Sequence, residues 1–130
     1  MSRVISIFLD CLEPIERLES QLEPILSVHF KELTGKGTKV FEARTRDSVI
    51  AITRHDFEND RDLNFEDYSY EIQIRPIRDQ LYDLHERRTL SYARSAFAEL
   101  KSVLKCNMML VDDLQHKLDE YHPASTTPNY

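Results

Sequence analysis

The sequence is poor in the residues that build loops, disulfide frameworks and metal clusters. Only two glycines and five prolines occur in 130 residues, which argues against long structureless segments. The two cysteines, Cys11 and Cys106, are isolated from each other and have no CxxC spacing. We therefore expect two buried free thiols, and neither a disulfide framework nor a zinc site. This pattern does not indicate redox chemistry.

Long apolar runs and basic clusters are also missing. Residues 1–9 hold one positive charge and a short apolar run, without a small-residue cleavage site or the roughly 18 apolar residues of a membrane span. We therefore expect a cytoplasmic protein with no membrane partner. The densest basic run, His85 to Arg88, is interrupted by Glu86 and is typical of a solvated helix face. The acidic overall balance argues against direct binding of nucleic acid, which depends on contacts to phosphates.

The chain does have a concentrated acidic segment, residues 55–71. Seven acids stand there against one base, Arg61, so this segment carries the entire net charge of −6. Four aromatic residues lie inside it. A local negative surface with aromatic residues is suited to a basic partner, whereas the simpler alternative is a solvated loop that serves solubility.

We predict that eight residues of the acidic segment form or border a partner-binding surface. Six of them are acids. The other two are phenylalanines, which we expect to be hard to bury in a loop, so that at least one is a candidate aromatic anchor for the partner. The eight residues are Asp56, Phe57, Glu58, Asp60, Asp62, Phe65, Glu66 and Asp67.

Hydrophobic periodicity predicts one α+β domain over residues 1–121 and a polar tail at 122–130. The expected order is β-α-β-β-β-α-β, with a single twisted, partly antiparallel sheet of about five strands packed against two main helices. Strands are predicted at 4–9, 39–45, 49–53, 68–76 and 108–111, and the glycines mark a loop at 33–39. Helices are predicted from 14 to just before 30, at 79–104 and, as a small final helix, at 114–121.

The apolar spacing also predicts which faces are buried. The core-facing stripes of the two main helices are Ile15, Leu18 and Leu22, and Leu90, Ala93, Phe97 and Leu100. Pro24 predicts a break in the first helix near 21–23, because proline disrupts a helix interior. Alternation along 68–76 places Tyr68, Tyr70, Ile72 and Ile74 on one face of a strand.

One metal motif is present in form. Asp60, Asp62, Asn64 and Glu71 have the ligand spacing of an EF-hand calcium loop. The match fails at the sixth position, where a sharp turn requires glycine and the chain has Phe65. Strands, not helices, are expected on both sides of the loop. We therefore expect no metal ligand and no cofactor.

Catalytic motifs are also missing. Paired acids such as Asp112 and Asp113 have no glycine-rich phosphate loop, nucleophile elbow or Cys–His pair to support them. The five histidines are scattered, and His55, the best candidate among them, is interpreted as a hydrogen-bonded strand end. We expect no catalytic residue and no enzymatic activity.

Four segments together resemble a known class of proteins: VISIFLDCLEPIERLESQLEPIL, VFEARTRDSVIAIT, HDFENDRDLNFEDYSYEIQI and YARSAFAELKSVLKCNMMLVDDLQHKLDEY. In overall pattern they resemble small bacterial immunity proteins that protect a cell from polymorphic toxins, especially those of contact-dependent growth inhibition systems. The resemblance implies binding and stoichiometric neutralisation of a cognate carboxy-terminal toxin domain, commonly a nuclease, in the cytoplasm. It carries over no individual binding residue.

Two other functions remain open at this point. The chain is alternatively an acidic adaptor or regulatory module for a different basic partner. The third interpretation is a metal-dependent hydrolase that uses the carboxylates of the acidic segment.

Overall fold

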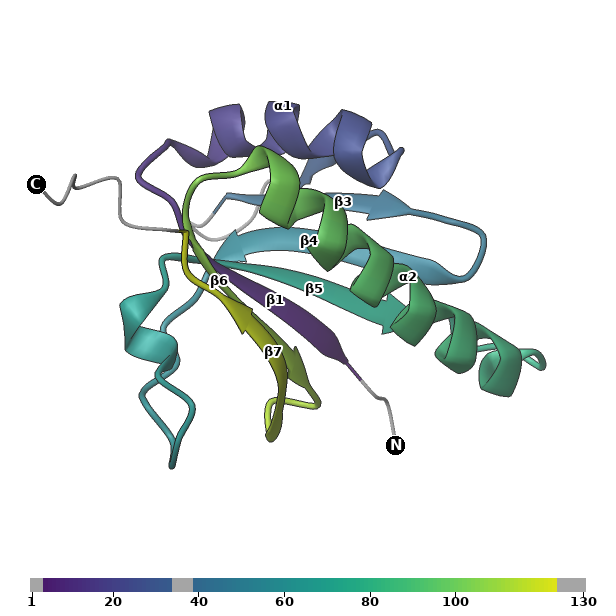
Figure 1. Cartoon of the computed structure of the whole chain (residues 1–130). Helices are drawn as coiled ribbons and strands as arrows, with labels where there is room; N and C mark the ends of the chain where they lie inside the picture. Colours follow the sequence, from purple (N-terminus) through teal and green to yellow (C-terminus); the bar gives the residue numbers. More distant parts are fainter. Residues whose placement is uncertain (1–3, 34–38, 124–130) are drawn as a thin grey trace, which may run out of the picture.

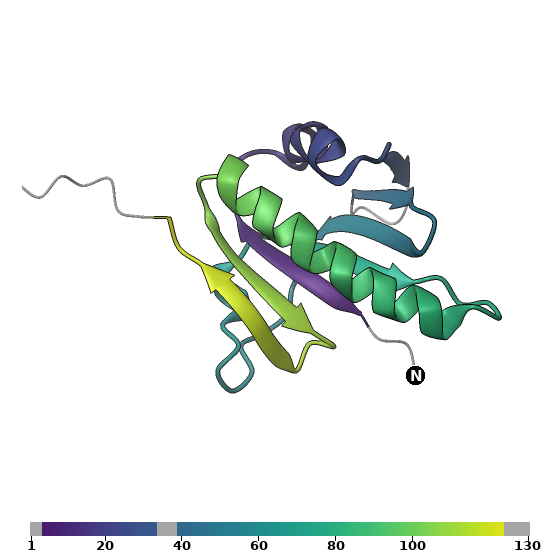
Figure 2. The ribbon, with the colours of Figure 1, turned by 45° about the vertical axis from the view of Figure 1, so that its right-hand side comes forward.

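The computed structural model describes residues 4–33 and 39–123, in which seven strands form one sheet and two long helices lie on one of its faces (Figures 1 and 2). The strand order is β2-β3-β4-β5-β1-β6-β7, and neighbouring strands are antiparallel. The elements are β1 (Ile5–Asp10), α1 (Ile15–Leu26), β2 (Lys31–Leu33), β3 (Val40–Arg44), β4 (Ser48–Arg54), the 3-10 turn η1 (Phe65–Asp67), β5 (Tyr70–Pro76), α2 (Tyr82–Val103), β6 (Asn107–Asp112) and β7 (His116–Tyr121).

The predicted α+β class is confirmed, and two details of the sheet are corrected. About five strands is too low a number for the described part of the chain. The sheet there is antiparallel throughout, because every pairing between neighbouring strands is antiparallel, including those of β1 with β5 and β6.

The strands alternate between two apolar layers. Ile5, Ile7 and Leu9 of β1 belong to the main core under the helices, whereas Phe8 belongs to a second cluster on the opposite face of the sheet. The main core also contains the buried stripes of both helices, as predicted, except that Leu90 is only partly buried. The second cluster consists of Phe8, Leu63, Phe65, Tyr68, Met109 and Val111.

The predicted break in the first helix is wrong. α1 continues through Pro24 to Leu26 and ends where Ser27 adopts a left-handed backbone with φ of 57°. Leu22 and Leu26, on either side of the proline along the buried stripe, are each at most 2% exposed. Burial of these two side chains holds the last turn in place against the local cost of the proline.

The predicted final helix is also wrong, because residues 116–121 form β7 and pair with β6. Asp113 and Leu114 both have φ of 55°, and the Gln115 amide donates to the Asp112 carbonyl. Two left-handed central residues are typical of the tight hairpin turn whose twist matches that of the strands it joins. This turn sends the chain back along β6 as a strand.

Strand β2 was missed because it has three exposed residues and no alternation. It is a strand only through its pairing with β3 at the sheet edge. Most of the predicted glycine loop at 33–39, and all of the predicted tail beyond residue 123, lie outside the described residues. Within the described part, neither helix has the length and apolar character to cross a membrane.

Candidate partner-binding surface

The acidic segment connects β4 to β5 and folds against the sheet face opposite the helices (Figure 1). Within it, Asp60 and Leu63 exchange two backbone hydrogen bonds of 3.0 and 2.8 Å and close a tight turn. Arg61, inside that turn, has φ of 55°. The short 3-10 turn η1 then leads into Tyr68. The segment is therefore a loop of defined shape.

Phe8 is the centre of an aromatic anchor for this loop. Its ring centroid lies 5.0 Å from that of His55, 6.2 Å from Phe57, 4.9 Å from Phe65 and 6.4 Å from Tyr68. Such separations are those of favourable aromatic pairs, each worth about 0.5–1.5 kcal/mol beyond the buried area. The Phe8 ring of β1 is therefore in contact with four rings of the acidic segment.

His55 ties the two ends of the loop together, which agrees with its interpretation as a hydrogen-bonded strand end. The Phe57 amide donates to Nδ1 of His55 over 3.1 Å, so Nε2 carries the hydrogen and donates to the Tyr68 carbonyl over 2.7 Å. Both ring nitrogens are used in the neutral imidazole. The histidine therefore has a positioning role in the loop.

Asn59 and Glu66 add a second cross-link. The Asn59 amide donates to the Glu66 carboxylate over 3.0 Å, and the Glu66 amide donates to the Asn59 side-chain carbonyl over 2.8 Å. Asn64 Nδ2 in turn donates to Asp67 Oδ2 over 2.8 Å. These bonds fix the carboxylates of Glu66 and Asp67 in direction while leaving both residues exposed.

The eight predicted contact residues separate into three groups. The six acids, Asp56, Glu58, Asp60, Asp62, Glu66 and Asp67, are all exposed. Phe57 is partly buried and packs against the second cluster. Phe65 is 4% exposed, so the expectation that it is hard to bury is wrong, and its ring anchors the loop from inside. The exposed surface of the segment is therefore mainly carboxylate.

The sequence held a signal for this burial. Residues 108–111 of β6 are all apolar, and such a continuous run is typical of a strand that is covered on both faces. The helices cover one face only. The other face of the sheet is covered by Leu63, Phe65 and Tyr68.

Glu71 has a different environment from the other acids of the segment. It is 1% exposed on β5, where Ser6 Oγ donates to Oε2 over 2.8 Å and Gln73 Nε2 donates to Oε1 over 3.2 Å. Burial raises the pKa of the Glu71 carboxyl. Glu71 is also the twelfth position of the EF-hand pattern. Its carboxylate is buried and bound by Ser6 and Gln73, whereas Asp60 and Asp62 are exposed. No group of three or more potential metal ligands occurs in residues 4–33 and 39–123.

Tyr68 is a further correction. Alternation predicts that it shares a face with Tyr70, but β5 begins only at Tyr70, and Tyr68 lies in the second cluster. Both rings are buried, in different apolar layers. The η1 turn just before Tyr68 changes the direction of the backbone and interrupts the strand alternation.

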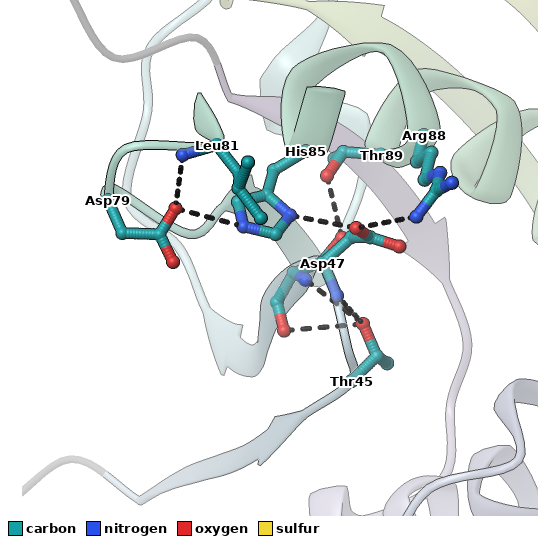
Figure 3. A network of polar contacts seen from close by, with 8 residues as sticks. Thr45, Asp47, Asp79, Leu81, His85, Arg88 and Thr89 are labelled. Carbon is teal, nitrogen blue, oxygen red and sulfur yellow. Dashed lines mark hydrogen bonds and ion pairs between the residues drawn. The ribbon is translucent and has the colours of Figure 1, made fainter. Parts of the chain in front are cut away.

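A second polar centre lies at the other end of β5 and was missed (Figure 3). The run from His85 to Arg88 was interpreted from sequence as a solvated helix face, which is wrong for His85, because it is 5% exposed, whereas Arg87 and Arg88 are exposed. Its Nδ1 lies 2.7 Å from Asp47 Oδ1 and its Nε2 lies 3.1 Å from Asp79 Oδ1. Both partners are carboxylates, so both nitrogens can donate at once only when the ring is protonated to the imidazolium.

The surroundings of His85 identify this centre as a clamp. The hydrogen bonds that Asp47 and Asp79 accept raise the pKa of His85, while the Leu81 amide and His85 lower the pKa of Asp79. Arg88 Nη1 lies 3.7 Å from the same Asp47 oxygen. The clamp joins α2 to the turn between β3 and β4, and no local pattern signals it because Asp47 and His85 are 38 residues apart.

The chain matches no protein-family model, no curated protein and no solved structure. The candidate surface is therefore defined by its own geometry.

Proposed function

We propose that this protein is an immunity-type inhibitor that binds a basic toxin domain through the acidic segment. The observation that supports this proposal is the combination of six exposed acids with a backbone fixed from inside by the second cluster. A surface that is ordered before binding loses less conformational entropy when it meets its partner. The resemblance to immunity proteins of contact-dependent growth inhibition systems points in the same direction.

The chemistry of the partner follows from the charge. A nuclease presents a basic groove to phosphates, and a carboxylate-rich loop is complementary to such a groove. Opposite charges steer the two proteins together, which accelerates association by about 10- to 1,000-fold at low salt. We place this encounter in the cytoplasm, where the inhibitor acts by stoichiometric occlusion and needs neither catalysis nor a cofactor.

The same surface also suits an adaptor for a different basic protein. The two functions differ in selectivity, because an inhibitor protects against one toxin encoded beside it. A hydrolase that uses the loop carboxylates has less support, since Glu71 is buried and accepts hydrogen bonds from Ser6 and Gln73.

The test is co-expression with the toxin domain encoded next to this gene, followed by pull-down and growth rescue. We expect a stable complex and full rescue at a one-to-one ratio. No complex and no rescue with the neighbouring toxin would contradict the inhibitor function. Binding to a basic protein that is not a toxin would instead support the adaptor.

Charge reversal locates the interface. Asp60→Lys with Asp62→Lys changes two exposed loop acids, and Glu32→Lys with Glu99→Lys changes two exposed acids elsewhere by the same total charge. We expect the loop pair to slow association by about tenfold or more at low salt and to weaken its salt dependence, while the control pair has little effect. Equal effects of the two pairs would move the interface away from the acidic segment.

A further inference from the structure

Two cysteines contact each other just beyond the end of the ladder between β1 and β6. Asp10 and Asn107 form the last pair of the ladder, and Cys11 and Cys106 adjoin these residues just outside the two strands. Their sulfur atoms lie 2.6 Å apart, although 95 residues separate them in the chain. Both side chains are partly exposed. Both thiols are free, as predicted, but the prediction that they are buried is wrong, and the sequence spacing gave no sign of their contact.

We propose that Cys11 and Cys106 form an intramolecular disulfide bond by exchange with a small disulfide compound. Directly opposed residues of antiparallel strands, such as Asp10 and Asn107, have Cα atoms about 4.5–5.5 Å apart, and the two cysteines adjoin this pair. Disulfides require a Cα separation of about 4.4–6.8 Å. The two sulfur atoms already face each other. The bond thus forms without a change in the sheet register that brings the thiols together.

Access to the pair is provided by an open cavity of about 620 Å³ whose walls include both cysteines. Leu12, on its rim, is 98% exposed, and Val103 is 55% exposed. A small molecule can therefore approach the sulfur atoms from solvent. Reactive cysteines differ from structural ones in this partial exposure.

The hydrogen bond between the thiols sets the order of attack. Either sulfur can donate this hydrogen bond; with Cys11 as the donor, the bond lowers the pKa of Cys106 and raises that of Cys11, which makes Cys106 the first thiolate. The Cys106 thiolate attacks one sulfur of the small disulfide, whose S–S bond breaks and releases the first thiolate. That thiolate takes the Cys11 proton. Cys11 then attacks the Cys106 sulfur of the mixed disulfide and releases the second thiolate, so that two electrons pass from the protein to the small disulfide.

Charges around the cavity select the reactant. Asp10 and Glu13 raise the pKa of both thiols by repulsion, and Lys105 is the basic residue among the described residues that line the cavity. Two acids against one base disfavour an anionic reactant such as glutathione disulfide. Cystamine, a small cationic disulfide, suits this environment better.

The experiment treats the full chain with cystamine, alkylates the remaining thiols, and measures the mass of the intact protein. The chain has two cysteines, so a monomer that lacks two hydrogen atoms and takes up no alkylating agent contains the Cys11–Cys106 bond. We expect this product, and we expect it to unfold at a temperature roughly 10 °C higher than the reduced chain, because the bond closes a long loop. Cys106→Ser is expected to slow the first exchange step more than Cys11→Ser.

Salt dependence tests the choice of reactant. The rate with cystamine should fall as salt rises, and the rate with glutathione disulfide should increase. The same direction with both compounds would overturn the selectivity. Three outcomes would overturn the proposed bond itself: a chain that stays reduced, a chain with one mixed disulfide on each cysteine, and disulfide-linked dimers. With the wild-type chain, each of these products has a different mass.

Discussion

Nδ1 of His85 lies 2.7 Å from Oδ1 of Asp47, and this contact fastens the first turns of α2 to the turn between β3 and β4. Hydrogen bonds to both Asp47 and Asp79 require a protonated His85, since a neutral imidazole donates through only one of its nitrogens. Asp79 occupies the other nitrogen. The fold thus contains an ion-pair clamp whose strength follows pH.

Stability should therefore fall as pH rises from about 6 to 9. The hydrogen bonds that Asp47 and Asp79 accept raise the pKa of His85 above its ordinary value of about 6.5, so folding favours the protonated ring. The resulting stabilisation is complete below the pKa of the unfolded chain and is lost as pH rises through the higher pKa of the folded protein. Thermal unfolding measured across this range checks the direction.

Asp47→Asn is the matched variant, because it keeps the shape of the side chain and removes the charge. We expect a lower unfolding temperature than wild type near pH 6 and a smaller difference between the two proteins near pH 9. A difference that is constant from pH 6 to 9 would contradict the clamp.

Acid should release the other half of the clamp. The Leu81 amide and His85 lower the pKa of Asp79 below its ordinary value of about 3.9. This contribution to stability is present above the ordinary value and is lost as pH falls through the lower folded pKa. Asp79→Asn should therefore reduce the acid sensitivity of unfolding below pH of about 4, which a denaturation series in acidic buffers measures.

Tyr68→Phe should leave stability unchanged or raise it by up to about 1 kcal/mol. The hydroxyl oxygen of Tyr68 is buried without a hydrogen-bond partner, and burial raises the pKa of this phenol to about 12. Its removal therefore eliminates an unsatisfied polar group. Urea denaturation gives the difference in the free energy of unfolding.

Tyr70→Phe is the control for that comparison. The Tyr70 hydroxyl donates to the Glu13 carbonyl and accepts from Arg54 Nη2 at 3.2 Å. Its loss should destabilise the fold by about 1–2 kcal/mol. Equal effects at the two tyrosines would show that the Tyr68 hydroxyl has a partner in solution.

Local patterns predicted most of the fold because most of its strands and helices, β2 and β7 excepted, carry their own sequence pattern. Alternation located β3 and β5, a β-branched run located β4, and the stripe from Ala93 to Leu100 gave the buried face of α2. The contacts missed are those between elements far apart in the chain. Cys11 meets Cys106 because β1 lies beside β6, and that strand order is a property of the whole sheet.

The candidate surface was predictable in composition and less so in shape. Charge alone identified the six acids, and the structure leaves all six exposed. Phe65 was placed wrongly because its position depends on Phe8, which comes from a strand 57 positions earlier. A loop residue has no periodicity of its own, so its burial follows from the surface beneath it.

Phe97→Ala should destabilise the fold by about 3–5 kcal/mol. Phe97 is 2% exposed in the main core, so the change removes buried apolar area and leaves a cavity. Leu12→Ala serves as the surface control, since Leu12 is 98% exposed and should change stability by less than about 0.5 kcal/mol. A loss below about 1 kcal/mol for Phe97→Ala would show that this helix face is not packed as described.

His55→Ala should separate the order of the acidic segment from its charge. The change removes the bonds to the Phe57 amide and the Tyr68 carbonyl but none of the six exposed acids. We expect hydrogen exchange at the Phe57 amide to accelerate by roughly 5- to 30-fold, as for the loss of one or two hydrogen bonds, while exchange in β1 and β5 stays slow.

Binding kinetics complete this last test. With the charges intact, association of His55→Ala with the proposed toxin partner should keep its rate and salt dependence, and dissociation should become faster because a looser loop must be ordered in the complex. The Asp60→Lys and Asp62→Lys pair should show the reverse, with slower association as its main effect. Slower association with unchanged dissociation for His55→Ala would mean that the shape of the loop affects the encounter and not the lifetime of the complex. That outcome would contradict preorganisation as the source of affinity.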